Sequence, residues 1–181
     1  MPPTLDSTPA LWPFAVHVYA LPGVAGLCLR LQDEHAFDVN VLLAILWRAC
    51  RGMEVDDAAL ERLLVAARPV QARVREIRAL RQSVGSDRAS EPRWQETYEQ
   101  LKAAELAAER VALSMLEQSL ASDPAPPPAS PTGAVARELA LAALGRLAER
   151  SSAQSCEPLL QALVEATLPR PSAGRDAMPT P

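Results

Sequence analysis

The sequence predicts an all-α protein: a helical bundle with two long antiparallel helices and short N-terminal helices, then a proline-rich linker and a short helical C-terminal tail. Three observations support this prediction. Apolar residues recur at i, i+3 and i+4 along most of the chain. Between Pro22 and Pro92 the only proline is Pro69, so helices can run long there. The chain has 181 residues, 49% of them hydrophobic, which is enough for one core.

The N-terminal part predicts two short helices. Residues 1–10 are polar and proline-bearing, which is typical of disorder. Residues 11–19 carry apolar side chains at helical spacing, with Pro13 in the first turn, where proline is tolerated. A proline and a glycine at 22–23 break this helix, and a second helix is expected over 24–32.

A central helix follows a polar turn at 33–38. Asp38 stands directly before it, where a carboxylate can accept hydrogen bonds from the free amides of the first turn. Apolar residues cover a broad face over 39–49, so this helix should be buried on more than one side. Gly52 ends it.

The two long helices are expected over 55–84 and 94–120. The first continues an apolar pattern for nearly eight turns, and Pro69 should kink or divide it. A loop is expected over 85–91. Because this loop is short, the two helices should pack antiparallel.

The domain boundaries follow from composition. One helical domain is expected over 11–121, and 122–133 is rich in Pro, Ala and Ser, as in an extended linker. Helical spacing returns in a tail over 134–168, which could dock on the bundle or remain separate. Residues 169–181 again have a composition typical of disorder.

Charge and cysteine content favour an unexported cytoplasmic protein. The net charge is −4, which argues against a nucleic-acid partner unless a local basic patch provides the contact. Cys28, Cys50 and Cys156 lie far apart, which fits reduced thiols better than disulfides or a zinc site. The start of the chain does not resemble a secretory signal, and the most apolar stretch would make a poor membrane span.

Aromatic residues are few and concentrated in the first quarter of the chain. The simpler interpretation is that they supply the bulky part of the core. The alternative is an aromatic pocket for an apolar or planar ligand. The candidates for such a pocket are Trp12, Phe14, Tyr19 and Trp47.

Two polar groups are the other candidates for function. Asp33, His35 and Asp38 could bind a metal or move a proton, but their spacing matches no known ligand motif, and a helix cap with its turn is the simpler interpretation. The arginines within 68–81 could pair with glutamates of the later long helix. They could instead bind a phosphate, an acidic peptide or RNA.

The sequence lacks the motifs of common enzymes. It has no glycine-rich phosphate loop, no GxSxG, no HExxH and no ExxH pair. We therefore predict no catalytic residues, no metal and no cofactor, and lean toward a protein that is not an enzyme.

Three blocks resemble a known family. The first has the pattern LWPFA at 11–15, then Tyr19, PGV at 22–24, CL at 28–29, LQD at 31–33, DVN at 38–40, LL at 42–43 and Trp47. The second is REIRALRQ at 75–82, and the third is LKAAELAAER at 101–110. This combination resembles the domain of unknown function 2390 family, a family of uncharacterised bacterial proteins, over about 11–116.

The resemblance implies no activity, cofactor or catalytic residue, but it does single out shared polar positions. These are Gln32, Asp33, Asp38, Asn40, Arg78, Arg81, Glu105 and Glu109. The chain departs from the family pattern at 35–37, where His-Ala-Phe replaces a turn in which a glycine is expected.

The sequence favours a non-catalytic protein–protein interaction or adaptor module, with a protein partner or a homodimer through the helix over 94–120. The first alternative is a small-ligand-binding protein or enzyme. Its pocket would lie between the aromatic block and the Arg and Glu faces, so Asp33, Asp38, Arg78 and Glu105 should meet at one cavity. The second alternative is an RNA- or ribosome-associated factor that uses the arginines from Arg68 to Arg81.

Overall fold

The computed structural model describes residues 10–121, 123, 131–151, 153 and 155–168. The ends expected to be disordered, and most of the expected linker, lie outside this range. The described residues form helices and no strand, which confirms the all-α prediction. The elements are α1 (Leu11–Tyr19), α2 (Val24–His35), α3 (Val39–Cys50), α4 (Asp57–Ser90), the 3-10 helix η1 (Pro92–Trp94), α5 (Gln95–Ser119), α6 (Gly133–Arg150) and α7 (Glu157–Thr167).

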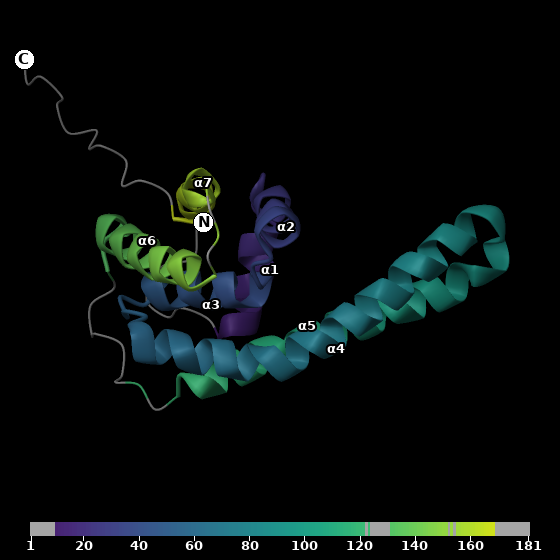
Figure 1. The fold of residues 1–181 in the computed structure, drawn as a ribbon, viewed down its shortest axis with the longest axis horizontal. Coiled ribbons are helices and arrows are strands. Elements are labelled where there is room, and N and C mark those ends of the chain that lie inside the picture. The colour runs from purple at the N-terminus through teal and green to yellow at the C-terminus, as the bar shows by residue number, and fades with distance from the viewer. Residues whose placement is uncertain (1–9, 122, 124–130, 152, 154, 169–181) are drawn as a thin grey trace, which may run out of the picture.

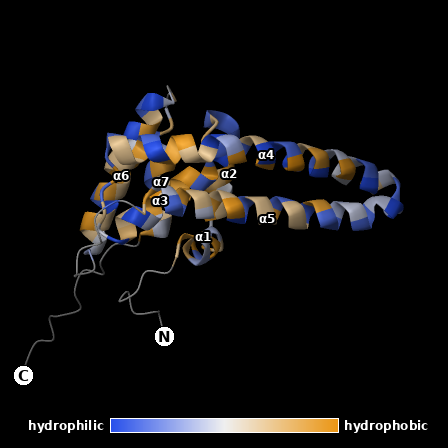
Figure 2. Ribbon diagram, turned by 90° about the horizontal axis from the view of Figure 1, so that it is seen from below, coloured by the Kyte–Doolittle hydropathy of each residue, from blue (hydrophilic) through white to orange (hydrophobic). Residues whose placement is uncertain are grey.

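The two longest helices form an antiparallel hairpin. Figure 1 shows α4 and α5 side by side along their length, with α1, α2, α3, α6 and α7 gathered around one end. The other end projects away from these helices as an arm. Figure 2, which is turned by 90°, shows the same separation of body and arm.

Helix α3 is the centre of the body. Its first turn is capped by Asp38, whose carboxylate accepts a hydrogen bond from the backbone N–H of Asn40 at 2.9 Å. Every residue from Val41 to Ala49 is buried. The expectation of a helix buried on more than one side is therefore confirmed, and α1, α2, α4, α5 and α6 all pack against it.

Helix α2 is longer than expected. The sequence predicted a polar turn from residue 33, but the helix continues to His35. Polar residues at 33–35 can stay helical because they lie on the less buried side, and no glycine or proline interrupts them. The break comes at Ala36, whose φ of 57° places it in the left-handed region. Ala36 lies within the turn at 35–37, where the family pattern leads us to expect a glycine, and glycine adopts this conformation without steric cost.

Helix α4 is also longer than expected. It runs through Pro69 without being divided, and it includes residues 85–90, which were predicted to be a loop. The loop prediction is wrong because Gly85 lies against the ring of Tyr98 on α5, so packing between the helices stabilises this last part of α4. The helix ends at Ser90 because Pro92 disfavours helical angles at the residue before it.

The apolar pattern of the long helices is only partly buried. Val74 and Val84 are buried, whereas Leu80 and Val111 are 55% and 54% exposed. Each of the two long helices has one side that contacts neither its partner nor the body, so apolar residues on that side face solvent. The sequence pattern could not distinguish this arrangement from a fully packed bundle.

The C-terminal helices dock on the body. Helix α6 packs on α3 and α7 packs on α2, so Leu144 and Leu163 are fully buried in the same core as the N-terminal helices. Arg146 of α6 also donates hydrogen bonds to the carbonyl of Val55 at 3.0 Å and to Glu54 at 2.9 Å. The structure therefore decides a question that the sequence left open.

In the described part of the chain, no single helix is both long and apolar enough to cross a membrane. Helices α1 and α2 reach the required length and composition only together, and they meet at 100°.

Candidate functional site

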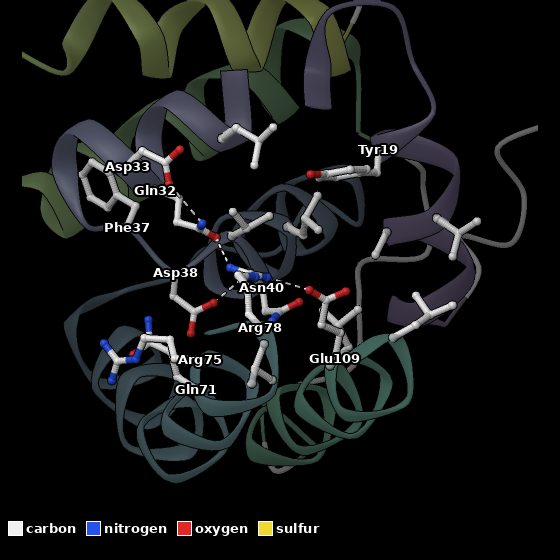
Figure 3. Close-up of a pocket in the computed structure, with 18 of the residues that line it drawn as sticks. Tyr19, Gln32, Asp33, Phe37, Asp38, Asn40, Gln71, Arg75, Arg78 and Glu109 are labelled. Atoms are coloured by element: carbon white, nitrogen blue, oxygen red, sulfur yellow. Dashed lines mark hydrogen bonds and ion pairs between the residues drawn. The ribbon is translucent and has the colours of Figure 1, made fainter. Parts of the chain in front are cut away.

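A cavity of about 810 Å³ lies where α1, α2 and α3 meet the base of the α4–α5 arm. Figure 3 shows polar side chains from several helices directed into it. The apolar part of its wall includes Trp12, Val16, Tyr19, Leu29, Phe37, Leu43, Leu106 and Leu113. The polar part consists of Gln32, Asp33, Asp38, Asn40, Gln71, Arg75, Arg78, Gln82 and Glu109.

Arg78 joins three helices at the floor of the cavity. Its guanidinium donates to Gln32 Oε1 of α2 at 2.7 Å, to Glu105 Oε1 of α5 at 2.7 Å and to Glu109 Oε1 of α5 at 2.9 Å. Glu105 is itself shared, because its other oxygen accepts a hydrogen bond from Arg81. The cross-helix ion pairs expected from the arginines and glutamates are thus present, and each of the three nitrogens of Arg78 donates one hydrogen bond.

The two glutamates have opposite electrostatic environments. Burial alone would raise the pKa of Glu105, but hydrogen bonds from Arg81 and Arg78 and the charges of these arginines lower it below its ordinary value. Burial raises the pKa of Glu109, and the single hydrogen bond from Arg78 does not compensate for it. Glu109 therefore lies in a site that disfavours its negative charge, although it is one turn from Glu105.

Asp38, like Glu109, lies in a site that disfavours its negative charge. Burial raises the pKa of this carboxyl, although backbone hydrogen bonds from Asn40 and Val41 and the charges of Arg75 and Arg78 act in the opposite direction. Asp38 forms no ion pair with a residue in the described ranges. Its charge is held mainly by backbone amides of the helix that it caps.

Most of the predicted polar residues meet at this cavity. Six of the eight line it: Gln32, Asp33, Asp38, Asn40, Arg78 and Glu109. Arg81 and Glu105 do not line the cavity but lie behind Arg78 and hold it in place. The convergence expected of Asp33, Asp38, Arg78 and Glu105 is therefore found for the first three, with Glu105 one hydrogen bond away.

The aromatic candidates separate into two pairs. Trp12 and Tyr19 line the cavity. Phe14 and Trp47 do not, because both are buried in the core. Spacing alone could not separate the pairs, since it does not say which side of a short helix faces a cavity.

Sequence reasoning missed Gln71, Arg75 and Gln82 as cavity residues. All three lie on α4 with Arg78, at i−7, i−3 and i+4 from it, so they share one side of the helix. This spacing from Arg78 could have identified the three residues from the sequence. Arg75 is exposed and has no hydrogen bond or ion pair with a described residue.

The described residues do not form a group of three side chains able to hold a metal ion. The buried thiols are also weak nucleophiles, because burial raises the pKa of Cys28 to about 11 and that of Cys50 to about 12. What the cavity offers is hydrogen bonding, charge and apolar surface.

Comparison with known proteins gives one match. A family model described as protein of unknown function DUF2390 matches residues 10–116, which include every helix that lines the cavity. No curated protein matches the chain, and neither does any solved structure. The matched range covers more than half of the sequence, so the chain belongs to the domain of unknown function 2390 family.

Proposed function

We propose that this protein binds a small molecule in the cavity between the N-terminal helices and the base of the arm. The observation that carries the proposal is the combination of a volume of about 810 Å³ with a wall that contains both apolar and polar side chains. Pockets for small molecules have volumes of roughly 300–1,000 Å³ and combine apolar walls with a few polar groups. The match to the family model supports the proposal, because it covers all the lining residues.

Exposed apolar side chains add to this support. Val16, Leu29 and Leu106 are each about half exposed, and all three face the cavity. They come from three different helices, so their proximity results from the fold. A ligand that covers them would remove apolar surface from water.

The test is a fragment screen by protein-detected NMR with the full chain and two variants. Ala79→Trp places a large side chain at the cavity wall, and Ala89→Trp places the same side chain on an exposed position of α4 that does not line the cavity. Fragments should shift resonances of cavity residues in the unmodified chain and in A89W, and should lose affinity at least tenfold in A79W. If A79W binds the fragments as well as A89W does, or if no fragment binds at millimolar concentration, the proposal is wrong.

A second candidate is the interaction or adaptor module. The observation that favours it is the projecting arm, which presents Trp94 near its tip and Leu80 on its side, at 43% and 55% exposure. Affinity capture from a bacterial lysate should then recover one stoichiometric partner with the full chain and lose it with Trp94→Ala. If the captured proteins are the same for both, the arm is not the interface. A homodimer through α5 would appear as a doubled mass in light scattering at high concentration.

RNA binding has less support than small-molecule binding or the adaptor role. Arg78 and Arg81 are engaged by Glu105, and Arg73 pairs with Glu76 at 3.0 Å, which leaves few free guanidinium groups.

A cytoplasmic, bacterial setting is part of the proposal. Three free cysteines support it, since thiols stay reduced in that compartment.

A further inference from the structure

We infer that the ligand of the cavity carries a primary ammonium group on an apolar body, with the ammonium placed against Asp38 and Glu109; this inference rests on the proposed binding function. Figure 3 shows these two carboxylates on either side of Arg78 and Asn40.

The first step is that an anionic ligand finds little free positive charge. Two guanidinium groups line the cavity, and Arg78 already donates to Gln32, Glu105 and Glu109. Of these two, only Arg75 has no hydrogen bond or ion pair with a described residue, and its side chain is exposed. An anion at the floor would also face Glu109 directly.

The second step is that carboxylate oxygens are in excess. The lining contains three carboxylates, Asp33, Asp38 and Glu109, and Glu105 lies directly behind Arg78. Against these four charges stand Arg75, Arg78 and Arg81, so the group as a whole carries one surplus negative charge.

The third step concerns hydrogen bonding. A carboxylate can accept about four hydrogen bonds. Glu109 accepts one, through Oε1 from Arg78, and Asp38 accepts backbone bonds only. Burial raises the pKa of both, and the charge of Asp38 raises that of Glu109 further, so an ammonium beside these carboxylates would stabilise their charged forms. An ammonium supplies three donors and a charge in one compact group.

The fourth step concerns the body of the ligand. Trp12, Val16, Tyr19, Leu29 and Leu106 form the apolar wall. An alkyl chain attached to the ammonium would cover the exposed parts of this wall, and affinity should then rise about fourfold for each added methylene.

The test is calorimetric titration of the full chain at pH 7 with hexylamine, 1-hexanol and hexanoate, which differ mainly in the head group. We expect hexylamine to bind at least tenfold more tightly than the other two. The same preference should persist in the shorter butylamine series, with weaker affinity.

Variants locate the contact. Asp38→Asn keeps the helix cap, because Asn caps as well as Asp, and Glu109→Gln keeps the size of the side chain. Each should weaken hexylamine binding at least tenfold, whereas Glu99→Gln, at an exposed position of α5 outside the cavity, should leave it unchanged. Circular dichroism melting checks that all three variants fold.

The outcomes separate the two proposals. If hexanol or hexanoate binds best and A79W abolishes that binding, the cavity is a binding site but the ammonium inference is wrong. The inference is also wrong if D38N and E109Q bind hexylamine like the unmodified chain. If none of the three probes binds while fragments from the screen do, only the ligand class is wrong; if fragments fail as well, both proposals fall.

Discussion

Glu105 and Glu109 show how one turn of a helix separates two roles. Glu105 receives Arg78 and Arg81 and is almost completely buried, so its charge is needed to neutralise two guanidinium groups. Glu109 shares only Arg78 and faces the cavity. The same residue type therefore pairs with two arginines of the arm at one position and lines the cavity at the other.

We predict that Glu105→Gln lowers the free energy of unfolding at pH 7 by roughly 1–3 kcal/mol, because two partly buried arginines lose their charged partner. Glu109→Gln should leave stability unchanged or raise it, since the ionised carboxylate there is disfavoured by burial. Urea unfolding of both variants measures the difference. Equal destabilisation by the two substitutions would contradict the prediction.

The contributions of Glu105 and Glu109 to the free energy of unfolding should change with pH in opposite directions. The stability that Glu105 contributes is present above the pKa of an unfolded glutamate and is lost as pH falls through its lowered folded pKa. The contribution of Glu109 is largest at low pH and is lost as pH rises through its raised folded pKa. The deficit of E105Q relative to the unmodified chain should therefore shrink in acid. A deficit that grows as pH falls would refute this assignment.

Ala36 lies in the turn at 35–37, where the chain departs from the family pattern, and it has a left-handed conformation. Its left-handed conformation is disfavoured for any residue with a Cβ by about 1–2 kcal/mol. We predict that Ala36→Gly stabilises the protein by about 1 kcal/mol, after the extra entropy of glycine in the unfolded chain is subtracted. Thermal melting measures this, with Ala20→Gly as a control, because Ala20 ends α1 in the right-handed region. A loss of stability in A36G would show that the methyl group is needed there.

The arm depends on contacts between its two helices and on little else. Near its tip, Tyr98 of α5 lies against Gly85 and beneath the guanidinium of Arg88, whose carbon is 4.1 Å from the ring centroid. A Cβ added at Gly85 would lie 3.1 Å from the Tyr98 ring. This close approach explains why a glycine, a poor helix former, is tolerated inside a long helix.

Pro69 interrupts the hydrogen bonding of α4 near the body. Its ring has no N–H to donate to the carbonyl of residue 65, and this costs up to about 3 kcal/mol in a helix interior. We predict that Pro69→Ala, at an exposed position, raises the midpoint of thermal unfolding. Hydrogen exchange should slow in the amides of α4 around residue 69, whereas an unchanged exchange rate would mean that the helix accommodates the proline without cost.

The whole molecule is held together by helices outside the part that matches the family model. Leu144 and Leu163, on α6 and α7, belong to the same buried cluster as α1, α2 and α3. Asp123 adds to this, since it pairs with Arg48 at 2.7 Å and with Arg62. The family region thus relies on the C-terminal helices to cover its core.

We predict that a chain ending at residue 131 does not unfold cooperatively, because the faces of α2 and α3 that α6 and α7 cover become exposed. In the full chain, Leu144→Ala should cost about 2–5 kcal/mol, as for other buried leucines. Circular dichroism melting and binding of a hydrophobic dye measure both effects. If the shortened chain melts with the same midpoint as the full one, the C-terminal helices are not part of the core in solution.

Local signals in the sequence were sufficient for the helices themselves. Asp38 was recognised as a helix start, and its carboxylate accepts a hydrogen bond from a first-turn amide at 2.9 Å. Asp56 caps α4 in the same way, at 2.7 Å. These signals depend only on neighbours in the chain, so spacing and residue type reveal them. They were less reliable at 33–35, where no glycine or proline ends the helix, and at 85–90, where packing against α5 extends the helix.

The cavity could be predicted only in part. Gln32, Arg78 and Glu109 were recognised as candidates, but their meeting around one guanidinium depends on the relative positions of α2, α4 and α5. The same is true of the opposite pKa shifts of Glu105 and Glu109. By itself the sequence determined which segments are helical and which polar residues to consider. Only the tertiary structure decided which of them share a cavity, because burial and charge pairing depend on residues that are distant in the chain.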